Sequence, residues 1–137
     1  MTDVANKTVL ITGAGGGFGR QMVQQFRAAG AKLILTDVGE QALQSAIDAA
    51  GDDLLASLVA NLATEEGCDA VIEACAAVDE PLDILVNNAG IAMAGRLDHV
   101  PRDQWETLMQ LNLIAPMRLT NSILPGMVER GSGHIVN

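Results

Sequence analysis

The chain has 137 residues, of which 49% are hydrophobic and 18% charged, and its formal net charge at pH 7 is −9. This hydrophobic content is enough to build a core and excludes a disordered chain. The negative charge, together with the lack of any Lys or Arg cluster, argues against nucleic acid and anionic membrane surfaces as partners. We therefore expect one domain over residues 1–137.

The sequence predicts neither a leader peptide nor a membrane anchor. The first residues lack the apolar segment of a secretory signal, and no apolar run approaches the ~20 residues of a membrane span. A cytoplasmic protein is the resulting expectation. Cys68 and Cys75 are seven residues apart, on one face of a predicted helix, and we interpret them as packed thiols. No metal site is expected.

Short apolar runs alternate with longer amphipathic segments along the chain. In chain order, this pattern predicts a strand at 8–12, a helix at 17–29, a strand at 33–36, a helix at 40–50, a strand at 54–59, a helix at 64–77, a strand at 82–86, a long helix from 102 or 103 to about 129, and the beginning of a fifth strand at 133–137. Uniformly apolar strands separated by helices are typical of a parallel sheet covered on both faces. With right-handed crossovers, we expect a Rossmann-type α/β fold, a doubly wound sheet in the order 3-2-1-4-5. Because dinucleotide-binding sheets usually have six or more strands, we expect this fold to be incomplete at its C-terminus.

A glycine-rich segment, TGAGGGFG over residues 12–19, joins the first predicted strand to the first predicted helix. Glycine there permits a tight turn and lets backbone N–H groups approach a pyrophosphate, while the helix N-terminus adds partial positive charge. By itself the segment is weak evidence, because a tight turn between a strand and a helix needs glycines even without a ligand.

Asp37 makes the glycine-rich segment more informative. It ends the second predicted strand, 18 residues after Gly19, where a carboxylate can accept hydrogen bonds from the hydroxyls of an adenosine ribose. The same carboxylate would repel a 2′-phosphate, and no Arg or Lys follows it. The sequence therefore favours NAD over NADP as the cofactor.

The spacing of the glycines, Thr-Gly-x-x-x-Gly-x-Gly, resembles that of the short-chain dehydrogenase/reductase family. Three further motifs follow in that family's order: Asn87-Asn88-Ala89-Gly90 after the fourth predicted strand, Asn112 followed by Pro116 in the long helix, and GHIVN at residues 133–137. Enzymes of this family transfer a hydride between NAD(P) and an alcohol or carbonyl substrate. The resemblance therefore implies an NAD-dependent oxidoreductase acting on a small molecule of that class.

The resemblance also implies which residues contact the cofactor. These are Gly13, Gly16, Gly17, Phe18, Gly19, Asp37, Asn61, Leu62, Asn88, Ala89 and Gly90. Asn61 and Leu62 would flank the adenine, although Asn61 replaces the Asp that is common in the family. Its amide oxygen can still accept a hydrogen bond from the adenine amino group.

Asn112 is the only candidate catalytic residue. Pro116 has no N–H to donate to the carbonyl four residues earlier, which frees the backbone oxygen of Asn112. In the family this Asn helps to hold a water in a proton relay, and we expect that role in an intact enzyme. The alternative is a kinked helix that carries a surface Asn.

The family's acid/base residues are missing from these 137 residues. Family members have a Ser after the fifth strand, then a Tyr, and a Lys four residues after the Tyr. This chain ends at Asn137, contains no Tyr, and has its only lysines, Lys7 and Lys32, at the first two strands. We therefore expect a cofactor-binding portion that is inactive alone. Two alternatives are a non-catalytic nucleotide-binding module and a methyltransferase-like domain, although the latter would not need the motifs at 87–90 and 112.

The long helix predicts self-association. Its apolar residues cover more than the stripe that one sheet can bury, namely Trp105, Leu108, Met109, Leu111, Leu113, Ile114, Met117, Leu119, Ile123, Leu124, Met127 and Val128. The outer edge of the fifth strand would also leave backbone groups unpaired. We therefore expect a homo-oligomer formed through the 105–128 helix, the strand edge, or both.

Overall fold

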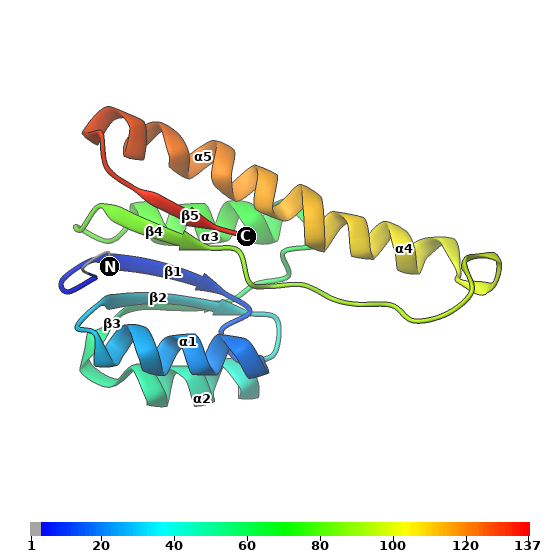
Figure 1. Cartoon of the computed structure of the whole chain (residues 1–137), viewed down its shortest axis with the longest axis horizontal. Coiled ribbons are helices and arrows are strands. Elements are labelled where there is room, and N and C mark those ends of the chain that lie inside the picture. The colour runs from blue at the N-terminus through cyan, green and yellow to red at the C-terminus, as the bar shows by residue number, and fades with distance from the viewer. Residues whose placement is uncertain (1–3) are drawn as a thin grey trace.

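In the computed structural model, which describes residues 4–137, five parallel strands form one sheet (Figure 1). The strands are β1 (Thr8–Thr12), β2 (Lys32–Asp37), β3 (Leu54–Val59), β4 (Leu82–Val86) and β5 (His134–Val136). Their order in the sheet is β3-β2-β1-β4-β5, which confirms the predicted topology. β1 lies in the middle of the sheet, and every residue of this strand is buried.

Helices cover both faces of the sheet (Figure 1). α1 (Gly17–Ala28) and α2 (Glu40–Ala50) lie on one face, and α3 (Glu65–Ala76) and α5 (Ala115–Arg130) lie on the other. Because successive strand residues point to opposite faces, each strand contributes to both layers of the core. Val9 and Ile11 of β1 pack in the cluster with residues of α1 and α2, whereas Leu10 packs in the cluster with residues of α3 and α5.

The predicted boundaries of the first three helices and of the strands agree with the structure to within one residue at each end. Thr64, predicted as the first residue of a helix, is instead the N-cap of α3, and its hydroxyl accepts a hydrogen bond from the N–H of Gly67 at 3.1 Å. Two short 3₁₀ turns, η1 (Gly51–Asp53) and η2 (Leu97–His99), add to the predicted elements.

The long helix differs from the prediction because it is not α-helical throughout. It consists of α4 (Arg102–Met109), the π-helical turn η3 (Gln110–Ile114) and α5. After η3, the N–H of Ala115 bonds to the carbonyl oxygen of Gln110, five residues back. Pro116 follows at once and has no N–H to donate. A wider turn directly before a proline is one recognised cause of an irregular helix, and such turns are frequent at functional sites.

α4 and the segment before it extend away from the sheet (Figure 1). Segment 87–101 leaves β4 in an extended path, passes through η2 and turns back into α4. Within residues 4–137, no helix has the length and apolar character needed to cross a membrane.

Candidate functional site

The candidate site lies where the carboxyl ends of β1 and β4 meet. From β1 the chain continues to one side of the sheet, through α1 to β2, whereas β4 and β5 lie on the other side of β1. Loops diverge at such a switch point, and this is where open α/β sheets bind their ligands. A cavity of about 300 Å³ opens there, within the size range of small-molecule sites.

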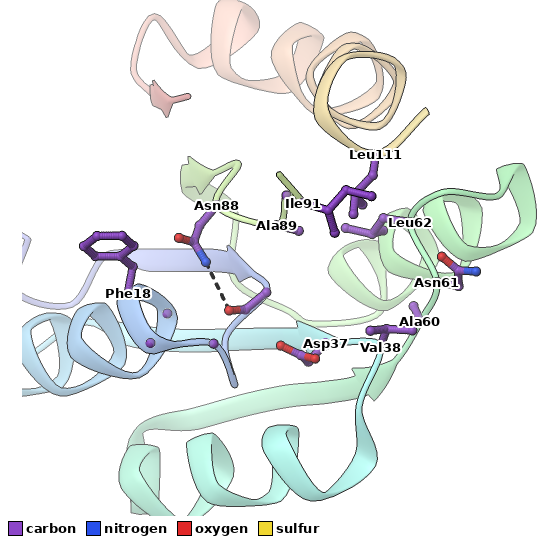
Figure 2. A pocket seen from close by; sticks show the side chains of 15 residues that line it. Phe18, Asp37, Val38, Ala60, Asn61, Leu62, Asn88, Ala89, Ile91 and Leu111 are labelled. Carbon is purple, nitrogen blue, oxygen red and sulfur yellow. Dashed lines mark hydrogen bonds between the residues drawn. The ribbon is translucent and has the colours of Figure 1, made fainter. Parts of the chain in front are cut away.

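Every residue predicted to bind the cofactor lines this one cavity (Figure 2). The glycines of the first loop and Phe18 form one side, and Asn88, Ala89 and Gly90 come from the loop after β4. Asp37 lies between Phe18 and Asn61, and Asn61 lies toward the opposite end from Phe18 (Figure 2). The structure therefore brings together three segments that are far apart in the sequence.

Thr12 joins the two loops that form the cavity. Its hydroxyl, which is buried, donates to the carbonyl of Val86 at 3.2 Å and accepts from the N–H groups of Asn88 and Ala89, each at 3.0 Å. The side-chain amide of Asn88 donates in return to the carbonyls of Thr12 and Gly13, at 2.9 and 3.0 Å. These bonds fix the glycine-rich loop relative to the loop after β4.

The N-terminus of α1 is arranged to receive an anion. The N-cap is Gly16, no side chain caps the helix, and its first turn contains no acidic residue. The first N–H groups of a helix have no partner within the helix, and the helix dipole favours negative charge at this end. Gly19 keeps the loop tight, because a Cβ at this position would collide with the carbonyl oxygen of Gly13. This geometry fits a pyrophosphate group.

Asp37 ends β2 with its carboxylate at the cavity. One oxygen accepts from the N–H of Gly15 at 2.9 Å, and the other accepts from the N–H of Gly39 at 3.0 Å. Because each carboxylate oxygen has two lone-pair sites, acceptor capacity remains for the hydroxyls of a ribose. Val38, the next residue, is 67% exposed and also lines the cavity.

Asn61 lies at the cavity, but its amide oxygen already has a partner. It accepts from the N–H of Ala63 at 3.0 Å and so shapes the turn before α3. A second lone pair remains on this oxygen, so a bond from the adenine amino group, expected from the sequence, stays a prediction.

Asn112 is placed in η3, next to the cavity-lining residue Leu111. Its side-chain oxygen accepts from the N–H of Ile91 at 2.9 Å, and its side-chain nitrogen donates to the carbonyl of Ile91 at 2.7 Å. The side chain thereby attaches the loop after β4 to the π-helical turn. Asn112 also lines a second hollow with Pro116 and Asn137. Its expected role in a proton relay stays a prediction.

Four residues that line the cavity were missed by the sequence analysis: Val38, Ala60, Ile91 and Leu111. Three of them directly follow or precede a residue predicted to bind the cofactor, and neighbouring positions were the signal that could have found them. Leu111 precedes Asn112, the candidate catalytic residue, and it reaches the cavity through the packing of η3 near the loop after β4.

The two cysteines are free thiols on α3, as the sequence suggested. Cys68 is buried and Cys75 is partly buried. Burial raises the pKa of the Cys68 thiol and raises that of Cys75 to about 11. Both thiols are therefore protonated near neutral pH and are poor nucleophiles. Among residues 4–137, no group of three or more His, Cys, Asp or Glu side chains is arranged to hold a metal ion.

Comparison with known proteins links this site to one family. The model of the short-chain dehydrogenase family matches residues 7–137. An NADP-dependent 3-hydroxy acid dehydrogenase, YdfG, from Shigella flexneri is 35% identical over 130 residues, which are 94% of this chain and 52% of that protein. The chain thus spans about half the length of this curated relative.

Solved structures agree with the sequence comparison. A short-chain dehydrogenase from Streptomyces avermitilis superposes with a TM-score of 0.89 at 34% identity, covering 97% of this chain and 48% of that one. L-sorbose reductase from Gluconobacter frateurii, solved in complex with NADPH and L-sorbose, also gives a TM-score of 0.89, at 29% identity over 98% of this chain and 53% of that one.

Removing the hydroxyl of Thr12 should loosen the junction between the two loops. We expect Thr12→Val to lower the free energy of unfolding by about 2 kcal/mol, because the N–H of Ala89 loses its acceptor. Thr12→Ser keeps the hydroxyl and serves as the matched control, with a smaller loss. Urea denaturation followed by circular dichroism measures both. A valine variant as stable as the wild type would contradict this role for the hydroxyl.

Proposed function

Because the chain belongs to the short-chain dehydrogenase family, we propose that it forms the cofactor-binding portion of an oxidoreductase that uses NAD(H) to interconvert an alcohol and a carbonyl compound. The observation that carries the proposal is a single cavity lined both by the uncapped N-terminus of α1 and by Asp37. When bound, the nicotinamide would accept or give the hydride.

The chain's own residues would hold the two halves of the cofactor differently. The N–H groups of the first turn of α1 would bind the pyrophosphate without any cationic side chain, because no Lys or Arg of residues 4–137 lines the cavity. Asp37 would bind the adenosine ribose, and Asn88 and Gly90 would border the other half.

The preference for NAD rests on residues 37 and 38. A 2′-phosphate would lie beside the Asp37 carboxylate, and Val38, the next residue, offers no positive charge to offset that repulsion. YdfG from Shigella flexneri is named for NADP and L-sorbose reductase was solved with NADPH. Those names describe the relatives, and the proposal for this chain depends on its own acidic side chain.

A second copy of the chain is proposed as partner for the α4–α5 helix. Buried residues Ala115, Leu119 and Met127 form its sheet-facing side. Another row of large apolar side chains stays exposed by 41–69%, comprising Trp105, Met109, Leu113, Met117, Leu124 and Val128. Such a continuous apolar row is unusual on a monomer. β5, with three residues, is the edge strand of the sheet and also has an unpaired side in the described chain.

Cofactor titration tests the proposed preference. We expect calorimetry to show NAD binding at least about tenfold tighter than NADP binding, because the carboxylate repels the 2′-phosphate. Val38→Arg should narrow or reverse the ratio by supplying a cation beside the phosphate. Leu97→Arg, at an exposed position (80%) in η2 outside both the cavity and the apolar row of α4–α5, controls for the change in net charge. Equal or tighter binding of NADP by the wild type would contradict the preference.

Turnover is expected to be absent from the 137-residue chain. The sequence has no Tyr, and its two lysines form ion pairs with Asp83 and Glu80, at the amino ends of β1 and β2 rather than at the cavity. A panel of alcohols and carbonyl compounds, followed by NADH absorbance, should give rates equal to a blank without protein. Activity that purifies with the chain and is lost in Asn112→Ala would show that another group serves as acid.

Light scattering at micromolar concentration tests the proposed self-association. The wild-type chain should have a mass of at least twice 14.3 kDa. Leu113→Glu and Met117→Glu should shift the chain toward the monomer, because a charge in an apolar interface is costly. Val59→Glu, on β3 and with 52% exposure, is the control. A 14.3 kDa monomer that these substitutions leave unchanged would disprove the interface.

A further inference from the structure

The glycine-rich loop is held in place partly by a side chain from another strand. The carbonyl of Thr36 accepts from the N–H of Ala14 at 3.0 Å, and the N–H of Gly16 bonds within the loop to the carbonyl of Gly13 at 3.1 Å. Between these two positions, the N–H of Gly15 is bonded to the Asp37 carboxylate at 2.9 Å. Asp37 thus completes an uninterrupted set of bonds along the base of the loop.

Gly15 is also the point at which the loop contacts α2. A Cβ on Gly15 would collide with the backbone of Ala42, so the two segments are in close contact. The second Asp37 oxygen binds the N–H of Gly39, which is the N-cap of α2. One carboxylate therefore joins the loop before α1 to the turn before α2, at the point where the loop packs against α2.

We propose that Asp37 is a positioning residue for the anion-binding loop: its carboxylate fixes Gly15 and thereby aims the first N–H groups of α1 at the pyrophosphate. This rests on the proposed dinucleotide function and deepens it, because the same carboxylate would bind the ribose and fix the loop that binds the pyrophosphate. A hydrogen bond to a charged acceptor is stronger than a neutral one, which suits this task.

A purely electrostatic role for Asp37 and a positioning role predict opposite changes in pyrophosphate affinity when its carboxylate is removed. If Asp37 acted on a bound pyrophosphate only through its charge, removing the carboxylate would relieve repulsion and tighten anion binding. If it holds the loop, removing it weakens the same binding although the pyrophosphate never contacts residue 37. Inorganic pyrophosphate has no ribose, so it separates loop positioning from contact with the ribose.

The experiment uses the ¹⁵N-labelled 137-residue chain as wild type, Asp37→Ala and Asp37→Asn. Amide hydrogen exchange is measured by NMR without ligand, and inorganic pyrophosphate and NAD are then titrated at constant ionic strength. Glu40→Gln is the charge-matched control, because Glu40 is an exposed acid in the first turn of α2. The buried amides of Leu10 and Ile34 report whether each variant keeps its fold.

In Asp37→Ala we expect the Gly15 amide to exchange about tenfold faster and pyrophosphate to bind several-fold more weakly, with Leu10 and Ile34 unchanged. Asp37→Asn keeps one acceptor oxygen, so its Gly15 exchange rate and its pyrophosphate affinity should lie between those of wild type and Asp37→Ala. Glu40→Gln should behave as wild type. Unchanged exchange at Gly15, or pyrophosphate bound by Asp37→Ala at least as tightly as by wild type, would overturn the proposal. The exchange measurement needs no ligand, so it separates this inference from the proposed function. A wild type that fails to bind NAD would refute the proposed function. Faster exchange of the Gly15 amide in Asp37→Ala would still support the inference.

Discussion

The buried hydroxyl of Thr12 is the contact on which the site depends. Parallel strands bring the ends of β1 and β4 together, but the loops that follow them carry backbone groups that the sheet cannot pair. The Thr12 hydroxyl and the Asn88 side-chain amide supply the missing partners. The hydroxyl makes three hydrogen bonds to backbone groups and the amide makes two. Each unpaired buried polar group would cost about 1–3 kcal/mol, so both loops are restricted to the arrangement that opens the cavity.

The charge of the molecule is distributed in a way that suits a site built from backbone groups. Although the net charge is −9, the first turn of α1 contains no acid. Both lysines pair with acids at the amino edge of the sheet, and Arg118 pairs with Glu65 between α5 and α3. The Arg118 guanidinium lowers the pKa of the Glu65 carboxyl, so this pair stays ionised. An anion at the cavity would therefore be held by oriented N–H groups and the helix dipole.

The π-helical turn links the long helix to the same site. Pro116 removes one N–H from the helix, and η3 accommodates the wider turn directly before it. Asn112 lies within that turn and uses both side-chain polar atoms on the backbone of Ile91. Asn112 thus fixes the loop after β4 at Ile91, while Thr12 fixes it at Asn88 and Ala89. The stretch held by these bonds contributes Asn88, Ala89 and Gly90 to the cavity.

Local patterns in the sequence were enough to predict the fold class and the strand order, and the resemblance to the short-chain dehydrogenase/reductase family implied most of the residues that gather at the cavity. Apolar runs record burial, and the glycines before α1 record a backbone requirement that is present in any context. The sequence could not predict the π-helical turn, the contact of Leu111 with the cavity, or the bond from Gly15 to Asp37. Each of these joins segments or turns whose relative position depends on packing, and Gly15 and Asp37 are 22 residues apart in the chain. A carboxylate at the end of a strand has the same sequence signature whether it binds a ribose, a backbone N–H or both, and its partners follow from the three-dimensional contact between the loop and α2.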